Sequence, residues 1–372
     1  MHQSRRSHGP VTSGPRTRRP RRAVVMLGTV TAVLAVLTGP ARADDLPLQC
    51  GTHQVHVAMS DGGPQDRTIV GQLCYRGPVL PRTVQLLVHG SSYNHLYWDF
   101  PYQNSYYSYV GAATLAGYAT FNIDRLGAGE SSHPSGLQLD MTAGAVALHN
   151  VISKLRSGDA EVGGHAFEDV VWVGHSLGSF YGWAEVAAYH DVDALILTGA
   201  LHASSPSWLA GAFAASYPAS EDPLFAGRPG VDWSLYVTSR PGTRGGMFYY
   251  APTTDPQVVA VDEQNKDTVA VGELPGLSLP TLPPDQAPSR LITVPVLVVV
   301  GANDGLYCAP DALNCSDQSA LQQYEASYYS PQAQLQVVVL PQTGHDLNLH
   351  LTAPAGYVLA QAWALTHVPP WA

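Results

Sequence analysis

Short apolar runs alternate with helical patterns along most of the chain. The runs are rich in Val, Ile and Leu and have the length of buried strands, which we expect at 54–59, 69–75, 83–88, 119–123, 169–173, 193–198, 294–300 and 335–340. Stretches with apolar residues at helical spacing lie between them, and we expect helices at 106–117, 140–156, 177–190, 317–329 and 353–366. Strands that alternate with helices predict an α/β domain with a mostly parallel sheet.

The alternation stops between the sixth and the seventh expected strand. From residue 201 to residue 290 the periodicity weakens, and stretches of Pro, Gly and Ser end in Leu279-Pro280-Thr281-Leu282-Pro283-Pro284. We interpret residues 201–290 as a cap that is inserted into one large domain and followed by a linker back to the sheet. The domain is expected to span residues 44–372, because about 330 residues suit one α/β domain with an insertion.

Residues 1–43 have the composition of a signal peptide. An Arg-rich stretch without acids precedes the apolar run from Ala23 to Leu37, and Ala41-Arg42-Ala43 matches a cleavage site with small residues. The mature chain should therefore begin near Asp44 and be exported by the general secretory or the twin-arginine route. The apolar run is too short for a confident membrane span, so we expect no stable membrane anchor after processing.

Charge and cysteine content fit an exported protein. Removal of residues 1–43 leaves 11 basic and 29 acidic residues, a net charge of −18 with neutral histidines, which disfavours nucleic acid and anionic membranes as partners. All four cysteines lie in the remaining chain, and an even number in an exported protein indicates disulfides. Cys308 and Cys315 bracket a short segment and should pair, and Cys50 would then bond to Cys74. The oligomeric state stays open.

The pentapeptide Gly174-His175-Ser176-Leu177-Gly178 lies where an apolar strand gives way to a helical stretch. A serine at the tip of such a sharp turn needs small neighbours, because larger side chains would clash, and its hydroxyl then projects from the edge of the sheet. The N–H groups of the following helix point at the same place and stabilise negative charge on a substrate oxygen. Ser176 is therefore the candidate nucleophile.

A serine hydroxyl becomes a strong nucleophile when a histidine accepts its proton, and a carboxylate must orient that histidine. Asp304 and His345 each follow an expected buried strand. Their order along the chain is Ser, acid, His, which differs from the orders in chymotrypsin and subtilisin. Asp346 lies beside the histidine, but a carboxylate on the next residue seldom reaches the neighbouring ring correctly, so we expect it to form a loop salt bridge.

With these residues in place, the chain resembles the α/β-hydrolase family. The segment from Val84 to Ser92 is similar to the family's third strand and its HG oxyanion loop, and the segment from Asn122 to Ser131 is similar to its D-x-x-G-x-G-x-S segment. The resemblance implies a mostly parallel eight-stranded sheet flanked by helices, with a cap after strand six. It also implies an oxyanion hole formed by the N–H groups of Ser91 and Leu177, and no catalytic role for Asp124 or Arg125.

These observations together predict an extracellular carboxylic-ester hydrolase that acts through an acyl-enzyme without a metal or another cofactor. In this interpretation Ser176 attacks the carbonyl carbon of a small-molecule ester, His345 transfers the proton and Asp304 fixes the imidazole. Cleavage of amides or peptides and acyl transfer to an alcohol use the same triad and remain alternatives. A non-catalytic binding protein of the same fold is a further alternative, and the intact triad weighs against it.

Aromatic residues are dense in the oxyanion loop and the cap, which favours a bulky apolar or aromatic substrate. The residues that we expect in the substrate pocket are His175, Tyr93, Trp98 and Trp208. His350 and His367 lie in or near the last expected helix and lack metal-site spacing, so we expect them to be solvated or hydrogen-bonded within the protein. Asp140 precedes a helical stretch and is expected to cap it.

Overall fold

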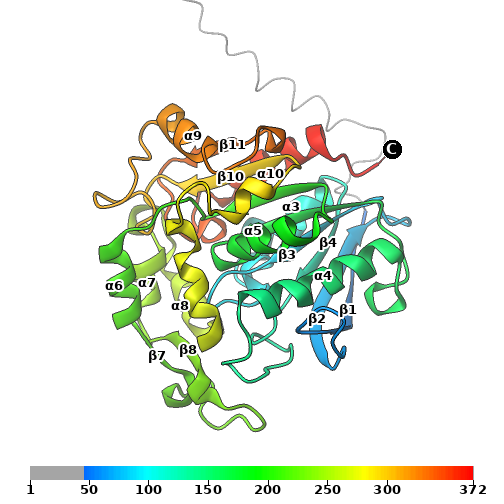
Figure 1. The fold of residues 1–372 in the computed structure, drawn as a ribbon, viewed down its shortest axis with the longest axis horizontal. Helices are drawn as coiled ribbons and strands as arrows, with labels where there is room; N and C mark the ends of the chain where they lie inside the picture. The colour runs from blue at the N-terminus through cyan, green and yellow to red at the C-terminus, as the bar shows by residue number, and fades with distance from the viewer. Residues whose placement is uncertain (1–45, 372) are drawn as a thin grey trace, which may run out of the picture. The chain divides into compact units, whose positions relative to one another are not determined.

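The computed structural model describes residues 46–371, so the expected signal peptide at residues 1–43 and the expected mature terminus at Asp44 lie outside the described residues. Eight strands form one sheet in the order β1-β2-β4-β3-β5-β6-β10-β11 (Figure 1). Strand β2 is antiparallel to both of its neighbours, and all other neighbours are parallel. The predicted mostly parallel, eight-stranded sheet is therefore confirmed. The strands are β1 (Leu48–Val57), β2 (Arg67–Arg76), β3 (Thr83–Val88), β4 (Ala119–Ile123), β5 (Asp169–His175), β6 (Ala194–Thr198), β10 (Val296–Gly301) and β11 (Gln336–Leu340).

Helices cover both faces of this sheet. Successive residues of a strand point to opposite faces, and in β5 Trp172 belongs to one core cluster while Val173 belongs to another. The first cluster includes apolar residues of α4 (Met141–Ser157) and α5 (Leu177–Tyr189), and the second includes residues of α3 (Tyr109–Leu115) and α10 (Ala353–His367). The sheet is thus the middle of three layers. The remaining helices are α2 (Asn104–Tyr107), α6 (Pro206–Ala214), α7 (Arg244–Phe248), α8 (Pro256–Asn265) and α9 (Gln318–Ala326).

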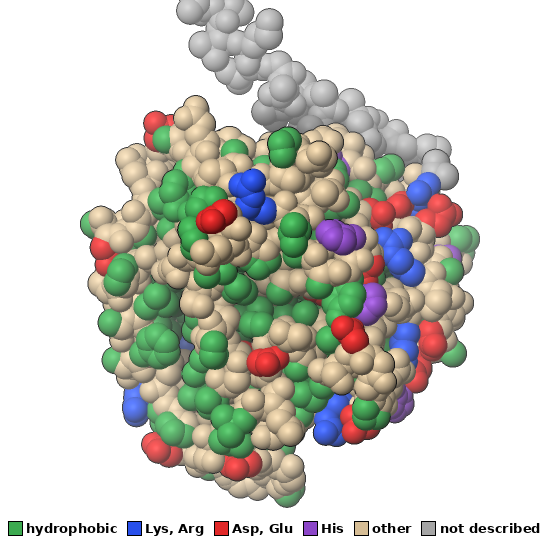
Figure 2. Space-filling view, viewed as in Figure 1, with side chains coloured by type: hydrophobic (Ala, Val, Ile, Leu, Met, Phe, Trp, Pro, Cys, Tyr) green, Lys and Arg blue, Asp and Glu red, His purple; other side chains and the backbone are tan. Residues whose placement is uncertain are grey.

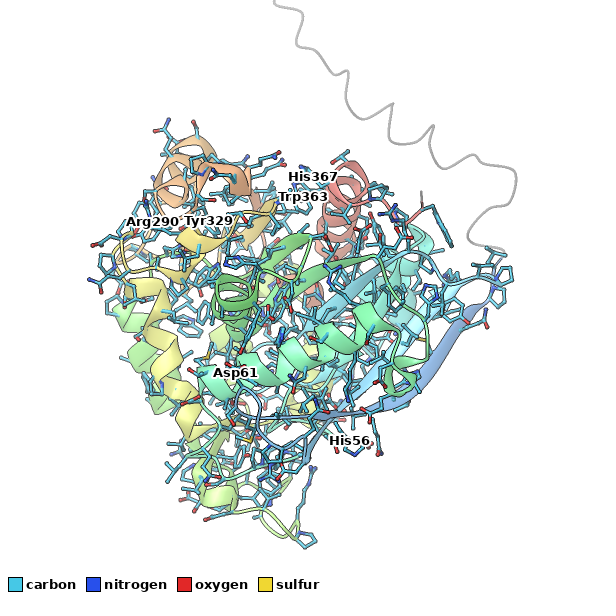
Figure 3. The ribbon with its side chains drawn as sticks, turned by 45° about the vertical axis from the view of Figure 1, so that its right-hand side comes forward. His56, Asp61, Arg290, Tyr329, Trp363 and His367 are labelled. Atoms are coloured by element: carbon cyan, nitrogen blue, oxygen red, sulfur yellow. A yellow bond between two sulfur atoms is a disulfide. The ribbon has the colours of Figure 1, made fainter. Side chains whose placement is uncertain are left out.

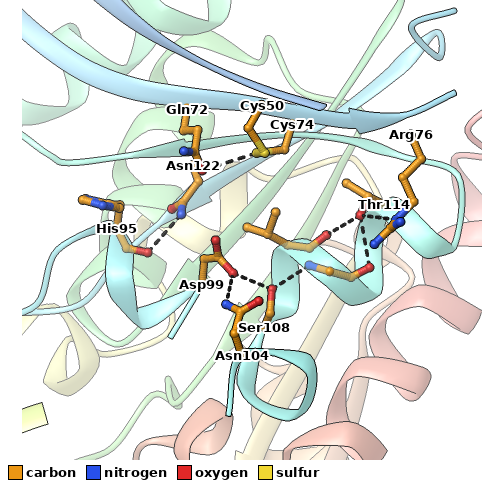
Figure 4. Close-up of a disulfide and its surroundings, with 12 residues drawn as sticks. Cys50, Gln72, Cys74, Arg76, His95, Asp99, Asn104, Ser108, Thr114 and Asn122 are labelled. Atoms are coloured by element: carbon orange, nitrogen blue, oxygen red, sulfur yellow. Dashed lines mark hydrogen bonds between the residues drawn. A yellow bond between two sulfur atoms is a disulfide. The ribbon is translucent and has the colours of Figure 1, made fainter. Parts of the chain in front are cut away.

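The first strand begins earlier than the sequence predicted. Leu48–Val57 pairs residue for residue with Arg67–Arg76, and the ladder places Cys50 directly opposite Cys74. A disulfide joins these two cysteines (Figure 4). Pairing with β2 and this cross-link extend the strand into a stretch that has no clear apolar alternation of its own, which is why the predicted start at residue 54 was wrong.

The single helix predicted at 106–117 is also wrong, because the chain forms two helices there. Ser108 has extended backbone angles (φ −110°, ψ 109°) between α2 and α3. Its Oγ accepts a hydrogen bond from the Gly111 N–H at 2.7 Å and donates one to Oδ1 of Asp99 at 2.7 Å (Figure 4). A serine that caps a helix in this way favours a helix start over a helix interior. The Asp140 side chain caps α4 as predicted, through the N–H of Ala143 at 2.8 Å.

The segment between β6 and β10 carries α6, α7 and α8 and a small sheet of its own. Its strands are β7 (Ser216–Pro218), β8 (Tyr236–Ser239) and β9 (Val269–Ala270), in the order β7-β8-β9. A buried ion pair between Glu273 of this segment and Arg125, which follows β4, ties the segment to the main sheet. Nearby, the Asp267 N–H donates to the Ser92 carbonyl at 2.9 Å. The segment is therefore anchored directly to the loop that follows β3.

Charged and hydrophobic side chains are unevenly distributed over the surface (Figure 2). On the face drawn in Figure 2, hydrophobic side chains are frequent at the left and centre, while positive and negative side chains lie mixed along the right. That face consequently has no continuous basic area. Among residues 46–371, none of the helices combines the length and apolar character that crossing a bilayer requires.

Candidate active site

The turn between β5 and α5 holds Ser176 in an unusual backbone conformation. The strand ends at His175 and the helix begins at Leu177, and Ser176 itself has φ 50° and ψ −119°. A Cβ atom on Gly178 would lie 2.1 Å from the Val88 carbonyl oxygen, which is closer than any real contact. A positive φ at a residue other than glycine is costly and is maintained only where the surrounding packing enforces it. The close packing around Gly178 supplies that constraint and exposes the serine at the edge of the sheet.

The loops after β10 and β11 bring Asp304 and His345 together. The Asn303 N–H donates to the Thr343 carbonyl at 2.8 Å and joins the two loops. Oδ2 of Asp304 lies 2.8 Å from Nδ1 of His345, and its Oδ1 accepts the Leu306 N–H at 2.9 Å. The carboxylate is fully buried, so both oxygens are fixed by protein donors.

Charge near His345 decides its protonation behaviour. Burial opposes a positive charge on the ring, but attraction to Asp304 and the hydrogen bond with it outweigh burial, and the pKa of His345 is raised from its ordinary value. A raised pKa makes the imidazole a stronger base. Because Nδ1 faces Asp304, Nε2 is the nitrogen that is free to accept a proton.

Ser176 and His345 lie on the wall of the same cavity, which has a volume of about 340 Å³. Within the part of the chain that the structure describes, no hydrogen bond joins the Ser176 hydroxyl to the imidazole. In free hydrolases this contact often tightens only when substrate is bound. The three predicted residues are thus brought to one end of the sheet, with the Asp304–His345 pair already formed.

Two backbone N–H groups next to Ser176 have no acceptor among the described residues. They belong to Ser91, in the loop after β3, and to Leu177, the first residue of α5. The loop is held by buried groups: His89 Nδ1 lies 2.9 Å from the Gly90 carbonyl oxygen, and Arg125 donates from Nε to the His89 carbonyl at 3.1 Å. These contacts fix the position of the Ser91 N–H.

Arg125 is a positioning residue whose role the sequence did not reveal. Its guanidinium also donates to the Gly90 carbonyl at 3.2 Å and pairs with Glu273. Its main-chain N–H donates to Nε2 of His89 at 2.9 Å. One buried arginine therefore connects the loop after β3 with the inserted segment. Arg125 lies in the D-x-x-G-x-G-x-S motif, but no local sequence pattern indicated which residues it would contact.

Asp346 does not form the loop salt bridge that we expected, because no Lys or Arg among the described residues pairs with it. It is completely buried and accepts a hydrogen bond from the Tyr93 hydroxyl, and its Oδ1 lies 3.4 Å from Nε2 of His175. Burial, followed by repulsion from Asp262, raises the pKa of Asp346 to about 7. The chain turns inward after His345 because Asp346 N–H bonds to the Phe248 carbonyl at 3.1 Å, which brings the carboxyl under the inserted segment.

The cavity includes two of the four residues expected in the pocket. Tyr93 and Trp208 line it, whereas His175 and Trp98 do not. The His175 ring is fully buried and stacks on Tyr97 with ring centres 4.3 Å apart, and Trp98 is fully buried in the core of α3 and α10. In the loop after β3, Tyr93 lines the cavity while Tyr97 and Trp98 lie in the core, and the sequence alone does not separate the two kinds.

The two histidines near the end of the chain, His350 and His367, have partners within the protein. His350 is buried, with Nδ1 2.7 Å from the Asp346 carbonyl oxygen, and Nε2 accepts the N–H groups of Tyr250 and Gly344. His367 stacks on Trp363 one turn earlier in α10, with ring centres 4.2 Å apart (Figure 3). Both are structural, as the sequence indicated.

A family model described as the alpha/beta hydrolase family matches residues 85–360. The chain belongs to the alpha/beta hydrolase family. A search of curated proteins gave no significant match. The matched region contains Ser176, Asp304 and His345.

Solved structures of several enzymes resemble this one at low sequence identity. A soluble variant of monoglyceride lipase from Saccharomyces cerevisiae is 16% identical and has a TM-score of 0.56, with 81% of this chain and 92% of that chain covered. An esterase from Exiguobacterium antarcticum is 15% identical, with a TM-score of 0.55 and 84% and 99% coverage. A bromoperoxidase from Bacillus anthracis is 16% identical, with a TM-score of 0.51 and 84% and 98% coverage. These likenesses show the fold, and their names include more than one chemistry, so the reaction must be argued from the site.

Proposed function

We propose that the protein is a secreted serine hydrolase that cleaves carboxylic esters with a bulky apolar acyl or alcohol group. The observation that carries this proposal is the position of Ser176 and His345 on a cavity whose lining contains no Asp, Glu, Lys or Arg. A catalytic serine that opens into an uncharged, largely apolar space selects neutral lipophilic substrates.

In the proposed reaction, Ser176 Oγ attacks the ester carbonyl and Nε2 of His345 accepts the hydroxyl proton. The N–H groups of Ser91 and Leu177 donate to the oxyanion of the tetrahedral intermediate. His345 then returns the proton to the leaving alcohol. A water molecule, deprotonated by the same imidazole, attacks the acyl-enzyme and releases the acid, while Asp304 stabilises the imidazolium in each half-reaction.

Secretion rests on two features. Residues 1–43 have signal-peptide composition, and the structure contains the disulfides Cys50–Cys74 and Cys308–Cys315. Disulfides persist in oxidising compartments. The segment at residues 201–290 supplies much of the cavity wall, including Trp208 and Phe248, and would act as the cap.

The test is a series of p-nitrophenyl esters of increasing acyl length. A cavity of about 340 Å³ has room for an acyl chain of several methylenes, and each buried methylene contributes about 0.8 kcal/mol, or about fourfold in kcat/KM. We therefore expect kcat/KM to rise with chain length up to medium-chain esters and then level off. A preference for acetyl over medium-chain esters, or for a succinyl ester that carries a carboxylate, would contradict the proposal.

A filling substitution sharpens the test. Val237 lines the cavity from β8, so Val237→Phe should lower kcat/KM for medium-chain esters and leave acetyl-ester turnover nearly unchanged. Val358 on α10 is 61% exposed and lies outside the cavity lining, so Val358→Phe is the matched control and should keep the wild-type profile. If both substitutions changed the substrate profile equally, the cavity would not be the part of the protein that selects the substrate.

A further inference from the structure

A second cluster of chemically reactive side chains lies away from Ser176, where α4 and α5 pack side by side (Figure 1). His149 comes from α4, Glu185 from α5 and Asp191 from the loop before β6. One nitrogen or oxygen atom of each lies within 4.8 Å of the corresponding atoms of the other two. Glu185 follows the start of α5 by about two turns, roughly 12 Å along the helix axis, so the cluster is separate from the catalytic cavity.

The Glu185 carboxylate is the unusual member of this cluster. It is completely buried, and neither of its oxygens has a hydrogen-bond partner among residues 46–371. Oδ1 of Asp191 is also inaccessible to solvent and without a partner. Burial of a carboxylate without hydrogen bonds or a counter-charge is strongly unfavourable, because the lost hydration is not replaced. These oxygens therefore need a hydrogen-bond donor or a positive charge that the described side chains do not supply.

Side-chain cations do not balance the two acids. Among the described residues, neither carboxylate has a Lys or Arg nitrogen within the 4.0 Å of an ion pair. Arg156 is near, but it donates to the main-chain carbonyl of Asp191, at 2.8 Å. Of the ionisable side chains at residues 46–371, only His149 pairs with both acids, with Nδ1 2.6 Å from Oδ2 of Asp191 and 3.7 Å from Oε1 of Glu185. At most one positive charge thus faces two negative charges.

We propose that His149, Glu185 and Asp191 bind a divalent transition-metal ion, for which Zn²⁺ is the best match. An imidazole nitrogen with two carboxylate oxygens is a donor set that Zn²⁺ accepts, whereas Ca²⁺ takes oxygen ligands. Donors about 2.1 Å from a tetrahedral Zn²⁺ lie about 3.4 Å apart, and the separations of 2.6 and 3.7 Å bracket this value. A small increase in the distance between His149 and Asp191 would admit the ion, and a water molecule would take the fourth coordination position.

The surroundings suit a site with access from solvent. The side chains of His149 and Asp191 are 28% and 17% exposed, so an ion can enter from their side. Glu185 lies at the buried end of the site. The ring of Tyr189 stacks on His149 with centres 3.9 Å apart, and its hydroxyl donates to Asp61 at 2.8 Å (Figure 3 labels Asp61). This stacking fixes the imidazole plane, as neighbouring groups do around other metal sites. The ion would join α4, α5 and the start of β6, which makes it a structural cross-link.

A proton bound by the carboxylates is the alternative to a metal ion for balancing the negative charge of the cluster. Burial raises the pKa of the Glu185 carboxyl to about 8, and a neutral carboxylic acid needs no metal. The two accounts differ in what the folded protein binds, so a binding measurement separates them.

The experiment uses the whole secreted protein after dialysis against a chelator. Zn²⁺ is titrated by calorimetry, and metal content is measured after dialysis in chelator-free buffer. We expect one tightly bound Zn²⁺ per chain and a rise in the midpoint of thermal unfolding of about 3 °C or more at saturating Zn²⁺. Calcium at the same concentration should not displace it. Ester turnover should not depend on the bound metal.

Variants locate the site. His149→Gln and Asp191→Asn change partly exposed side chains, and each should weaken Zn²⁺ binding about tenfold or more. The exposed His190 is adjacent in sequence and has a left-handed backbone (φ 52°), so His190→Asn keeps that conformation and should bind like the wild type. The proposal is overturned if the wild type binds no Zn²⁺, if Ca²⁺ displaces Zn²⁺, or if His149→Gln and Asp191→Asn bind as tightly as the control.

Discussion

Oδ2 of Asp304 lies 2.8 Å from Nδ1 of His345, across the loops that end two neighbouring parallel strands. This contact leaves Nε2 as the basic nitrogen of a ring that lines the same cavity as Ser176. The structure thereby selects Asp304 over the adjacent Asp346, whose carboxyl faces Tyr93 and His175.

The first prediction compares these two acids. Asp304→Asn should reduce kcat by about four orders of magnitude, because the amide favours the wrong tautomer of His345. Asp346→Asn should be mild, because an amide can still accept from Tyr93 while its NH₂ group donates to His175 Nε2. Steady-state kinetics of both purified variants provides the measurement. The opposite ranking would transfer the orienting role to Asp346.

The second prediction concerns pH. His345 must be neutral to accept a proton, so kcat/KM should fall about tenfold per pH unit below its pKa. Because Asp304 raises that pKa, the midpoint of the acidic limb should lie above the ordinary value of about 6.5. In Asp304→Asn the residual activity should have its midpoint at lower pH, since the attraction to Asp304 is lost while burial still lowers the pKa of the ring. A wild-type profile that is flat from pH 8 to the onset of acid unfolding would count against His345 as the base.

The third prediction concerns the disulfide Cys308–Cys315. The Cys308 N–H donates to the Asp304 carbonyl at 2.7 Å, so the closed loop begins in the turn that carries the acid. Loss of this short loop should lower the free energy of unfolding by about 2.5 kcal/mol on chain entropy alone. The double replacement by serine should therefore lower the thermal midpoint and turnover together.

Two controls accompany this variant. Thiol titration of the denatured, unreduced wild type should find no reactive thiol, because both cysteine pairs are bonded. Replacement of Cys50 and Cys74, at the far end of the sheet from the triad, should lower stability by about 3.5 kcal/mol with little effect on turnover at low temperature. If both double variants affected kcat alike, the Cys308–Cys315 bond would have no specific role in holding Asp304.

The fourth prediction concerns Arg125, which holds the loop that carries the Ser91 N–H. Arg125→Met leaves the buried Glu273 without its counter-charge and should destabilise the protein by about 3–5 kcal/mol. Combining it with Glu273→Gln should recover much of the stability, since no unpaired charge remains. Recovery of kcat should be smaller, because the His89 and Gly90 carbonyls still lack their donor. Chemical denaturation and kinetics of the single and double variants measure the two effects separately.

Local patterns predicted the eight strands of the main sheet, the helices α4, α5, α9 and α10, and the order of the candidate triad, but not the helices and strands of the inserted segment. Ser176, Asp304 and His345 each lie in the turn or loop that follows a parallel strand, and a parallel sheet brings such positions to one edge. Features that depend on pairing between distant segments did not appear in the sequence. The start of β1 depends on its partner β2, the role of Arg125 depends on Glu273, and the Asp346 carboxyl is buried by the inserted segment. The cluster of His149, Glu185 and Asp191 likewise has no recognisable spacing, because three separate elements contribute to it.

Covalent labelling tests the central claim most directly, namely that Ser176 is an activated nucleophile. The wild-type protein should react with a fluorophosphonate probe, and mass spectrometry of the digest should place the adduct on Ser176. Ser176→Ala should lose labelling and nearly all ester turnover while keeping the wild-type thermal midpoint, because the residue's role is chemical. Labelling that persists in Ser176→Ala, or an adduct on another residue of the wild type, would contradict the account.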